Sequence, residues 1–445
     1  MKKDFGKMLT FQNRKIIDIT LSREKKYQTI IGFGGAMTDS SGINIASLTD
    51  AAQDLLMQQY FGDRGIQYTI IRVPIGGTDF STHSYSLDDT PYDIQLKDFK
   101  LSEEDKKYKI PYIRLAMRLS KTYPIHLMGC SWSAPAYMKS NQLLRGVGTL
   151  GRAYYQTYAN YLTKFLQEYK KQGFNFVTMS AQNEPIIGGT PLTTYNGMEW
   201  NAWTQTDFVL NYLRPTLSEN GFENVKIIIG DDQRVFMPNW LLEMLTYKPE
   251  ISKYIDGIGI HWYLDSISDP NELTKIHKTP GFENKFIIYT EASVNSLCGK
   301  RGVTLGEWEN GEDYLKSLID TLNNWNQGWI DWNLVLDLNG GPNWVNNVVS
   351  APIIVNASAN EFYKNPTFYA LGHVSKFIVP GSIRIDMVNG HDKIVATAFD
   401  TPDNRTVIVL LNLYGRQYNI FIQDIERSWF QSLAILPHSF MTVIY

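Results

Sequence analysis

Two glutamates stand at the ends of apolar runs, where a carboxyl group is costly to bury. Glu184 closes FNFVTMSAQNEP (174–185), directly after Asn183, and Glu291 closes KFIIYTE (285–291). A carboxylate in such a place is either paired with a partner or needed at the mouth of a cavity. Two carboxyl groups that face each other across a sugar can divide the cleavage of its glycosidic bond. One protonates the departing oxygen, and the other meets the anomeric carbon.

Each of these positions also has a simpler structural interpretation. Glu184 could cap a local turn, and Glu291 could be a core carboxylate that Arg72 or His261 satisfies. For the aspartates that follow other apolar runs, each taken in isolation, loop capping is the favoured interpretation; these are Asp79, Asp231 and Asp232. The residue types alone leave both interpretations open.

Other kinds of catalytic site are not indicated. The sequence has no H-E-x-x-H motif and no Cys/His cluster at ligand spacing, so we expect no metal and no other cofactor. His261 is more typical of a hydrogen-bonded wall residue than of a metal ligand. A serine hydrolase would carry Gly-x-Ser-x-Gly, which is absent. Cys130 and Cys298 are the only cysteines, and we expect both to be bystanders.

Eight short β-rich runs precede or contain these residues. Most are continuously apolar rather than alternating, which is typical of parallel strands covered on both faces. Helical patterns lie between several of them, at 47–61, 154–172 and 312–325, and Thr49 or Asp50 is a plausible N-cap for the first. The predicted strands are residues 30–36, 68–75, 125–131, 174–181, 225–232, 256–263, 285–292 and 329–336.

This alternation predicts an α/β fold, a (β/α)8 TIM barrel over residues 30–378. An open doubly wound sheet is the competing architecture, but it would normally carry a G-x-G-x-x-G turn, which is absent. GFGG at 32–35 is not a phosphate loop, because no lysine or helix N-terminus follows it at the required spacing.

The pattern changes after about residue 378, where short strands follow one another without helices. SIRIDMV, KIVATAF, RTVIVLLNL, YNIFIQ and SFMTVIY predict a small antiparallel β-sandwich over 379–445. The segment RKIIDITLS (14–22) is also strand-like. We expect residues 1–29 to join that sandwich, so that both termini build one domain.

The barrel prediction brings the polar residues together, because functional residues of such barrels lie at the C-terminal ends of the strands. Those ends combine two glutamates with tryptophans, a tyrosine and amides, the set that sugar chemistry uses. In chain order they carry Asp79, Trp132, Asn183, Glu184, the run 231–234, His261, Trp262, Tyr263, Glu291, Trp332 and Asn333.

Composition excludes several classes of partner. The net charge is −3, and no stripe of basic and aromatic residues indicates a nucleic-acid surface. No apolar run is long enough for a transmembrane helix. The N-terminus MKKDFGKMLTFQ lacks the apolar region of a signal peptide, which predicts a cytoplasmic protein. A secreted or lysosomal protein whose leader had been removed would look the same.

The sequence resembles glycoside hydrolase family 30, most closely its acid β-glucosidase branch, over nearly the whole chain from about Lys15. The matching segments are long and occur in the same order, which makes the resemblance specific. They are residues 32–48, 68–81, 180–185 (SAQNEP), 231–234 (DDQR), 259–265 (GIHWYLD), 290–293 (TEAS), 328–347 and 365–382.

The resemblance implies a retaining β-glycosidase. By the family pattern Glu184 would be the acid/base and Glu291 the nucleophile. Arg72 and His261, together with Tyr263, would support the nucleophile. The residues expected to bind the sugar are Asp79, Trp132, Asn183, Tyr263, Trp332 and Asn347.

The expected substrate is a β-linked glycoside, either an oligosaccharide, an aryl glycoside or a glycolipid. Asp79, Trp132 and Trp332 offer an acceptor and indole donors suited to the 4- and 6-hydroxyls, which favours glucose as the sugar. The resemblance implies an exo-acting β-glucosidase of the glucosylceramidase type. The alternatives are an endo-β-1,6-glucanase, a β-xylosidase or a β-fucosidase of the same family, or a non-catalytic carbohydrate-binding protein. The loop 186–203 differs in length from the family pattern, although Tyr195 is expected to occupy an equivalent wall. The loop 294–308 also differs, so ceramide specificity does not carry over.

Overall fold

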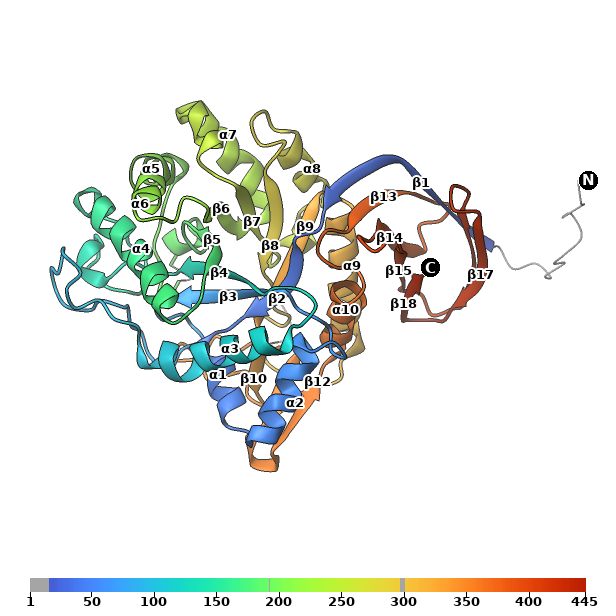
Figure 1. Cartoon of the computed structure of the whole chain (residues 1–445), viewed down its shortest axis with the longest axis horizontal. Coiled ribbons are helices and arrows are strands. Elements are labelled where there is room, and N and C mark those ends of the chain that lie inside the picture. The colour runs from blue at the N-terminus through green and yellow to red at the C-terminus, as the bar shows by residue number, and fades with distance from the viewer. Residues whose placement is uncertain (1–15, 192, 297–300) are drawn as a thin grey trace, which may run out of the picture. The chain divides into compact units, whose positions relative to one another are not determined.

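The computed structural model describes residues 16–191, 193–296 and 301–445 (Figure 1). Within these residues the chain divides into two compact units. One comprises Ile30–Pro380, and the other combines the segment up to Thr29 with Gly381–Tyr445. Residues 14–15 of the predicted N-terminal strand and Cys298 lie outside the described residues.

Eight parallel strands close into a barrel in the larger unit (Figure 1). The first strand pairs with both the second and the last, so the sheet has no free edge. This closure confirms the predicted (β/α)8 barrel and excludes the open doubly wound sheet. The strands are β2 Gly32–Ala36, β3 Ile70–Ile75, β4 His126–Ser131, β5 Phe176–Ser180, β6 Lys226–Gln233, β7 Gly257–His261, β8 Phe286–Glu291 and β9 Asn326–Asn333.

Apolar side chains from five of these strands pack into one buried cluster, which explains why the runs lack polar alternation. The cluster consists of Ile70, Met128, Ile228, Ile288 and Ile330. The GFGG run forms β2 itself, and its glycines permit close strand approach. A Cβ atom on Gly34 would lie 1.9 Å from the carbonyl oxygen of Ile70.

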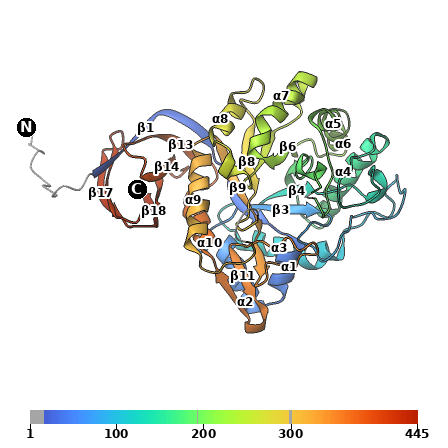
Figure 2. The ribbon, with the colours of Figure 1, turned by 180° about the vertical axis from the view of Figure 1, so that it is seen from behind.

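The helices of the barrel unit include the three that the sequence predicts, as α2, α4 and α9. Thr49 is the N-cap of α2, although its side chain makes no capping hydrogen bond. α9 and α10 lie side by side (Figures 1 and 2). The helices described are α1 Asp39–Ala46, α2 Asp50–Phe61, α3 Ile110–Leu119, α4 Tyr155–Lys171, α5 Ala202–Phe208, α6 Arg214–Glu219, α7 Met237–Tyr247, α8 Asn271–Lys278, α9 Trp308–Leu322 and α10 Pro366–Ser375. None of these helices is both long and apolar enough to cross a membrane.

A small three-stranded sheet follows the last barrel strand, and the sequence patterns did not predict it. β10 (Val335–Asp337) pairs in parallel with β11 (Ile353–Asn356), which pairs antiparallel with β12 (Glu361–Lys364). β11 is labelled in Figure 2. These strands have three or four residues each, too few to show a periodic pattern.

The smaller unit contains strands from both ends of the chain, as predicted. One seven-stranded sheet has the order β17-β16-β1-β13-β14-β15-β18, and its inward side chains share one apolar core. The pairing is antiparallel except between β1 and β16, which are parallel. The strands are β1 Ile16–Thr29, β13 Ile383–Asn389, β14 Ile394–Asp400, β15 Thr406–Asn412, β16 Tyr418–Asp424, β17 Trp429–Ile435 and β18 Ser439–Ile444.

Candidate active site

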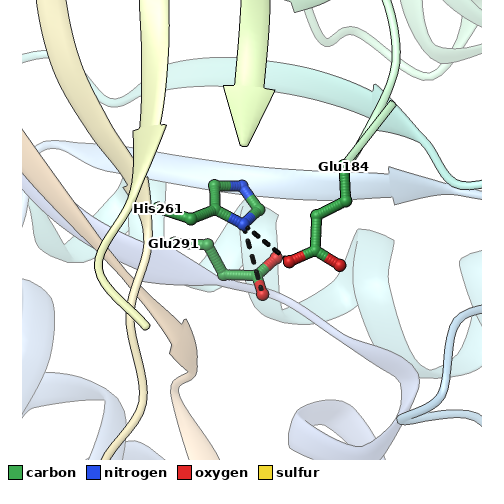
Figure 3. A group of neighbouring side chains, drawn as sticks. All are labelled: Glu184, His261 and Glu291. Carbon is green, nitrogen blue, oxygen red and sulfur yellow. Dashed lines mark hydrogen bonds and ion pairs between the residues drawn. The ribbon is translucent and has the colours of Figure 1, made fainter. Parts of the chain in front are cut away.

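Glu184 and Glu291 meet at the C-terminal mouth of the barrel. Glu291 is the last residue of β8, and Glu184 follows β5 by four residues. His261, the last residue of β7, faces both, with Nδ1 3.1 Å from Oε1 of Glu184 and 4.0 Å from Oε1 of Glu291 (Figure 3). One carboxylate oxygen from each glutamate and a ring nitrogen of His261 all lie within 4.8 Å of one another. A loop cap would not bring the two carboxyl groups together in this way.

The carboxylate of Glu291 is held from both sides by donors. Arg72 on β3 donates from Nη1 to Oε2 at 2.5 Å, and the hydroxyl of Tyr263 donates to Oε1 at 2.8 Å. Arg72 has no exposed surface and Glu291 is 5% exposed. The core-carboxylate interpretation is therefore correct in that Arg72 pairs with Glu291, although the pair lies at the barrel mouth.

Glu184 has a different set of partners on its two oxygens. Oε1 accepts from Gln233 Nε2 at 3.2 Å and faces His261 Nδ1 at 3.1 Å, while Oε2 accepts from the hydroxyl of Tyr195 at 3.1 Å. Its backbone is left-handed, with φ of 45°, a conformation that is unfavourable for residues other than glycine. The Glu184 amide donates to the Asp231 carbonyl at 2.9 Å, which holds this strained position.

A shift in strand register separates the roles of two consecutive aspartates. The irregularity lies between Gly230 and Asp232 in the β6–β7 pairing, and Asp231 has φ of 57°. Asp232 accepts from the amides of Ile186 and Ile187 at 2.8 and 3.2 Å, so it caps the loop after Glu184, as the capping alternative predicted.

Asp231 instead points at the site. Its Oδ2 accepts from Arg72 Nη2 at 3.1 Å and from the thiol of Cys130 at 3.1 Å, and its Oδ1 faces His261 Nε2 at 3.1 Å. Burial would raise the pKa of Asp231, but the charge of Arg72 and the hydrogen bond from His261 outweigh it and hold that pKa well below its usual range. The lowered pKa favours the carboxylate form of Asp231, which contacts Arg72 and His261.

Arg72 also orients Asn183. Its Nη2 donates to Asn183 Oδ1 at 2.7 Å. A guanidinium group has no acceptor, so this contact fixes which end of the amide is oxygen. The Asn183 nitrogen is then the end directed away from Arg72, where it can donate to a substrate hydroxyl.

The residues predicted to bind sugar form the remaining wall. Asp79 is buried and accepts from Asn347 Nδ2 at 2.8 Å. Trp132 and Trp332 stack, with ring centroids 5.1 Å apart, and the Arg72 guanidinium carbon lies 4.8 Å from the centroid of Trp132.

The structure therefore brings every predicted site residue to one mouth. Eight are joined by direct contacts, and Asp79 with Asn347 lies near enough for the charges of both glutamates to act on it. Sequence reasoning did not assign Asp231 and Gln233 to the site, although DDQR had marked their strand end. It also did not assign Tyr195, which donates to Glu184, or Cys130, which was expected to be a bystander but donates to Asp231. Spacing in the sequence does not show which of the adjacent residues Asp231 and Asp232 faces the site.

Comparison with known proteins identifies the family. The model of the glycosyl hydrolase family 30 TIM-barrel domain matches residues 30–378, and that of the family's beta sandwich domain matches residues 381–443. The chain belongs to glycosyl hydrolase family 30. It is therefore a glycoside hydrolase that acts on a glycoside, as the resemblance implied.

Relatives of this family 30 hydrolase include named glucosylceramidases. Lysosomal acid glucosylceramidase of Mus musculus is 40% identical over 422 residues, which is 94% of this chain and 81% of the mouse protein. Putative glucosylceramidase 3 of Caenorhabditis elegans is 40% identical over 435 residues, 96% of this chain and 82% of that protein. Among solved structures, SrfJ from Salmonella typhimurium superposes with a TM-score of 0.88 at 27% identity, covering 97% of this chain and 92% of SrfJ.

Contacts with carboxylates favour the protonated form of His261 in this hydrolase. Burial would lower its pKa, but the charge of Glu291 and the hydrogen bonds to Asp231 and Glu184 raise it to about 10. Glu184, His261 and Glu291 have a spacing that could hold a metal ion. A protonated imidazole has no lone pair for a metal, and carboxylate oxygens face both ring nitrogens, from Glu184 at Nδ1 and from Asp231 at Nε2, each at 3.1 Å. The donor set fits a proton-transfer site better than a metal site.

The pKa of Asp79 leads to a stability prediction. Burial, followed by the charges of Glu291 and Glu184, raises that pKa to about 8. A raised carboxyl pKa contributes stability at low pH that is lost as pH rises through about 8. Asp79→Asn removes this ionisation, so we expect it to match the wild type near pH 4 and to be more stable at pH 8, by on the order of 1–3 kcal/mol. Urea unfolding at the two pH values measures the difference, and an equal effect at both would contradict it.

Proposed function

We propose that the protein is a retaining, exo-acting β-glucosidase of the glucosylceramidase type, which works by double displacement. The observation that supports retention best is the separation of the two glutamates, whose nearest oxygens lie within 4.8 Å. Retaining glycosidases place their carboxyl groups about 5–5.5 Å apart, whereas inverting enzymes leave about 6.5–9.5 Å for a water molecule.

In the first step Glu291 acts as the nucleophile. Its carboxylate oxygen forms a bond to the anomeric carbon while the glycosidic bond breaks, and Glu184 transfers its proton to the departing oxygen. Arg72 and Tyr263 hold Glu291 as a carboxylate aimed at the sugar. Burial raises the pKa of Glu291, and the charges of His261 and Arg72 oppose that rise.

In the second step a water molecule releases the sugar. Glu184, now a carboxylate, takes a proton from the water as the water oxygen attacks the anomeric carbon and the bond to Glu291 breaks. Two inversions leave the β configuration unchanged. Asn183 supports both transition states, because its oriented amide can donate to the 2-hydroxyl, an interaction that strengthens as oxocarbenium character develops.

Two arguments support glucose as the sugar. The relatives at 40% identity are named glucosylceramidases. Asp79 accepts a hydrogen bond from Asn347, and the indoles of Trp132 and Trp332 stack on each other, a set of groups that suits the hydroxyls at the 4- and 6-positions. A xyloside has no 6-hydroxyl to engage these groups.

A second candidate activity comes from more distant relatives. Endo-1,6-beta-D-glucanase neg1 of Aspergillus fumigatus is 24% identical over 431 residues. The products formed from β-1,6-linked glucose oligomers therefore test exo against endo action. An exo-glucosidase would release glucose from every β-1,6-linked glucose oligomer, whereas an endo-glucanase would first release shorter oligomers.

The test of the proposed function follows the product's anomeric form. Proton NMR during hydrolysis of 4-nitrophenyl β-glucoside should show β-glucose first, with α-glucose appearing only by mutarotation. Initial α-glucose would mean inversion and would contradict the proposal. On a panel of aryl glycosides, kcat/KM for the β-glucoside should exceed that for the β-xyloside by at least about tenfold. The β-fucoside and β-galactoside complete the panel, and glucosylceramide in detergent tests the lipid aglycone.

A further inference from the structure

Lys139 is a buried lysine whose ammonium group has no acidic partner among the residues that the structure describes. It follows the short helix Ala136–Met138 after β4, and 3% of its surface is exposed. Its Nζ donates to the carbonyl oxygens of Leu144 at 2.9 Å and Gly197 at 2.6 Å. Burial lowers its pKa to about 7, and no carboxylate in the described part of the chain opposes this effect. An ammonium group buried at such a cost needs a structural or functional reason.

The two carbonyls belong to different loops at the barrel mouth. Leu144 lies in the loop 139–150 after β4, and Gly197 lies in the segment 193–199 after β5. These segments also pair through backbone hydrogen bonds, from Gly146 to the Tyr195 carbonyl at 3.2 Å and from Gly197 to the Leu144 carbonyl at 3.2 Å. Lys139 therefore joins the two loops at the point where they run alongside each other.

The segment 193–199 carries Tyr195, the only described residue that hydrogen-bonds to Oε2 of Glu184. Oε1 of Glu184 accepts from Gln233 Nε2 and faces His261 Nδ1, which donates when the ring is protonated, so Oε2 is the oxygen available to a proton. A tyrosine hydroxyl can donate to the carboxylate form and accept from the acid form. Tyr195 thus contacts the oxygen through which Glu184 would exchange its proton.

We propose that Lys139 is a positioning residue for proton transfer, which holds the segment 193–199 so that Tyr195 meets Oε2 of Glu184. The inference rests on the proposed acid/base role of Glu184. Lys139 itself touches neither the substrate nor the glutamate. It acts through two carbonyl groups, one of which lies two residues after Tyr195.

The experiment compares substrates whose leaving groups differ in their need for a proton. For Lys139→Met we expect kcat/KM to fall by about tenfold on phenyl β-glucoside and by less than twofold on 2,4-dinitrophenyl β-glucoside, whose leaving group departs without protonation. Tyr195→Phe should show the same difference, and the double variant should be no worse than either single one. Equal losses on both substrates, or additive losses in the double variant, would overturn the proposal.

Lys285→Met is the matched control. Lys285 is half-buried, and its Nζ also binds a backbone carbonyl, that of Ile255 at 2.8 Å, but it lies at the start of β8, away from the mouth. Lys285→Met should leave kcat/KM unchanged on both phenyl β-glucoside and 2,4-dinitrophenyl β-glucoside. If Lys139→Met does not fold, Lys139→Gln, which keeps an amide donor, is measured by the same criterion. Azide rescue of Glu184→Ala tests the acid/base role separately, so its failure is distinguishable from a failure of the Lys139 proposal.

Discussion

Glu291→Gln is expected to lower kcat on 4-nitrophenyl β-glucoside by roughly 10⁴-fold or more, because an amide cannot form the glycosyl–enzyme bond. Azide should not restore activity, since the glutamine side chain still occupies the space beneath the anomeric carbon. The measurement is steady-state hydrolysis. Asp265→Asn is the control, because Asp265 is a largely buried carboxylate that pairs with Arg234 at 2.9 Å and contacts neither glutamate in the described interactions. Near-normal activity of Glu291→Gln would show that the nucleophile is another residue.

The variant should remain folded, which makes the loss of activity interpretable. Glutamine keeps the shape of the side chain and can still accept a hydrogen bond from Tyr263. Arg72 retains a buried anionic partner in Asp231. Burial also disfavours the charge of Glu291. We therefore expect a change in melting temperature of only a few degrees, which circular dichroism measures.

Glu184→Ala is expected to lose about 10²–10⁴-fold in kcat/KM on substrates with poor leaving groups, the usual contribution of a general acid. With 2,4-dinitrophenyl β-glucoside the first step needs no proton, so the glycosyl-enzyme should accumulate and its hydrolysis should limit the rate. Added azide should then accelerate turnover, because it attacks without general-base assistance and fits the space left by the side chain.

The product identifies the mechanism. Azide attack on an α-linked glycosyl-enzyme gives a β-glucosyl azide, which NMR distinguishes from the α-anomer. Absence of rescue, or an α-azide, would contradict the assignment of Glu184 as the acid/base. Gln233→Ala provides the comparison, since it removes a donor to Oε1 but leaves the carboxyl group in place.

Much of the barrel could be predicted because its strands are apolar on both faces. Continuous runs such as IIIG in β6 have few alternatives to a buried parallel strand. Strand β17, WFQSLAI, was missed because most of its residues are exposed or half-exposed and it carries no buried pattern. The parallel pairing of β1 with β16 was missed for a different reason. It joins segments at opposite ends of the chain, and no local pattern records the direction of such a pairing.

The sequence by itself determined that Glu184 and Glu291 would share one mouth. All strands of a parallel barrel point the same way, so side chains at their C-terminal ends must converge. Only the tertiary structure decided what each neighbour does there. A register shift turns Asp231 inward while Asp232 caps a loop, and Lys139 finds a carbonyl 58 residues away. Such contacts depend on distances between atoms that come together only when the chain folds, so no local sequence pattern predicts them.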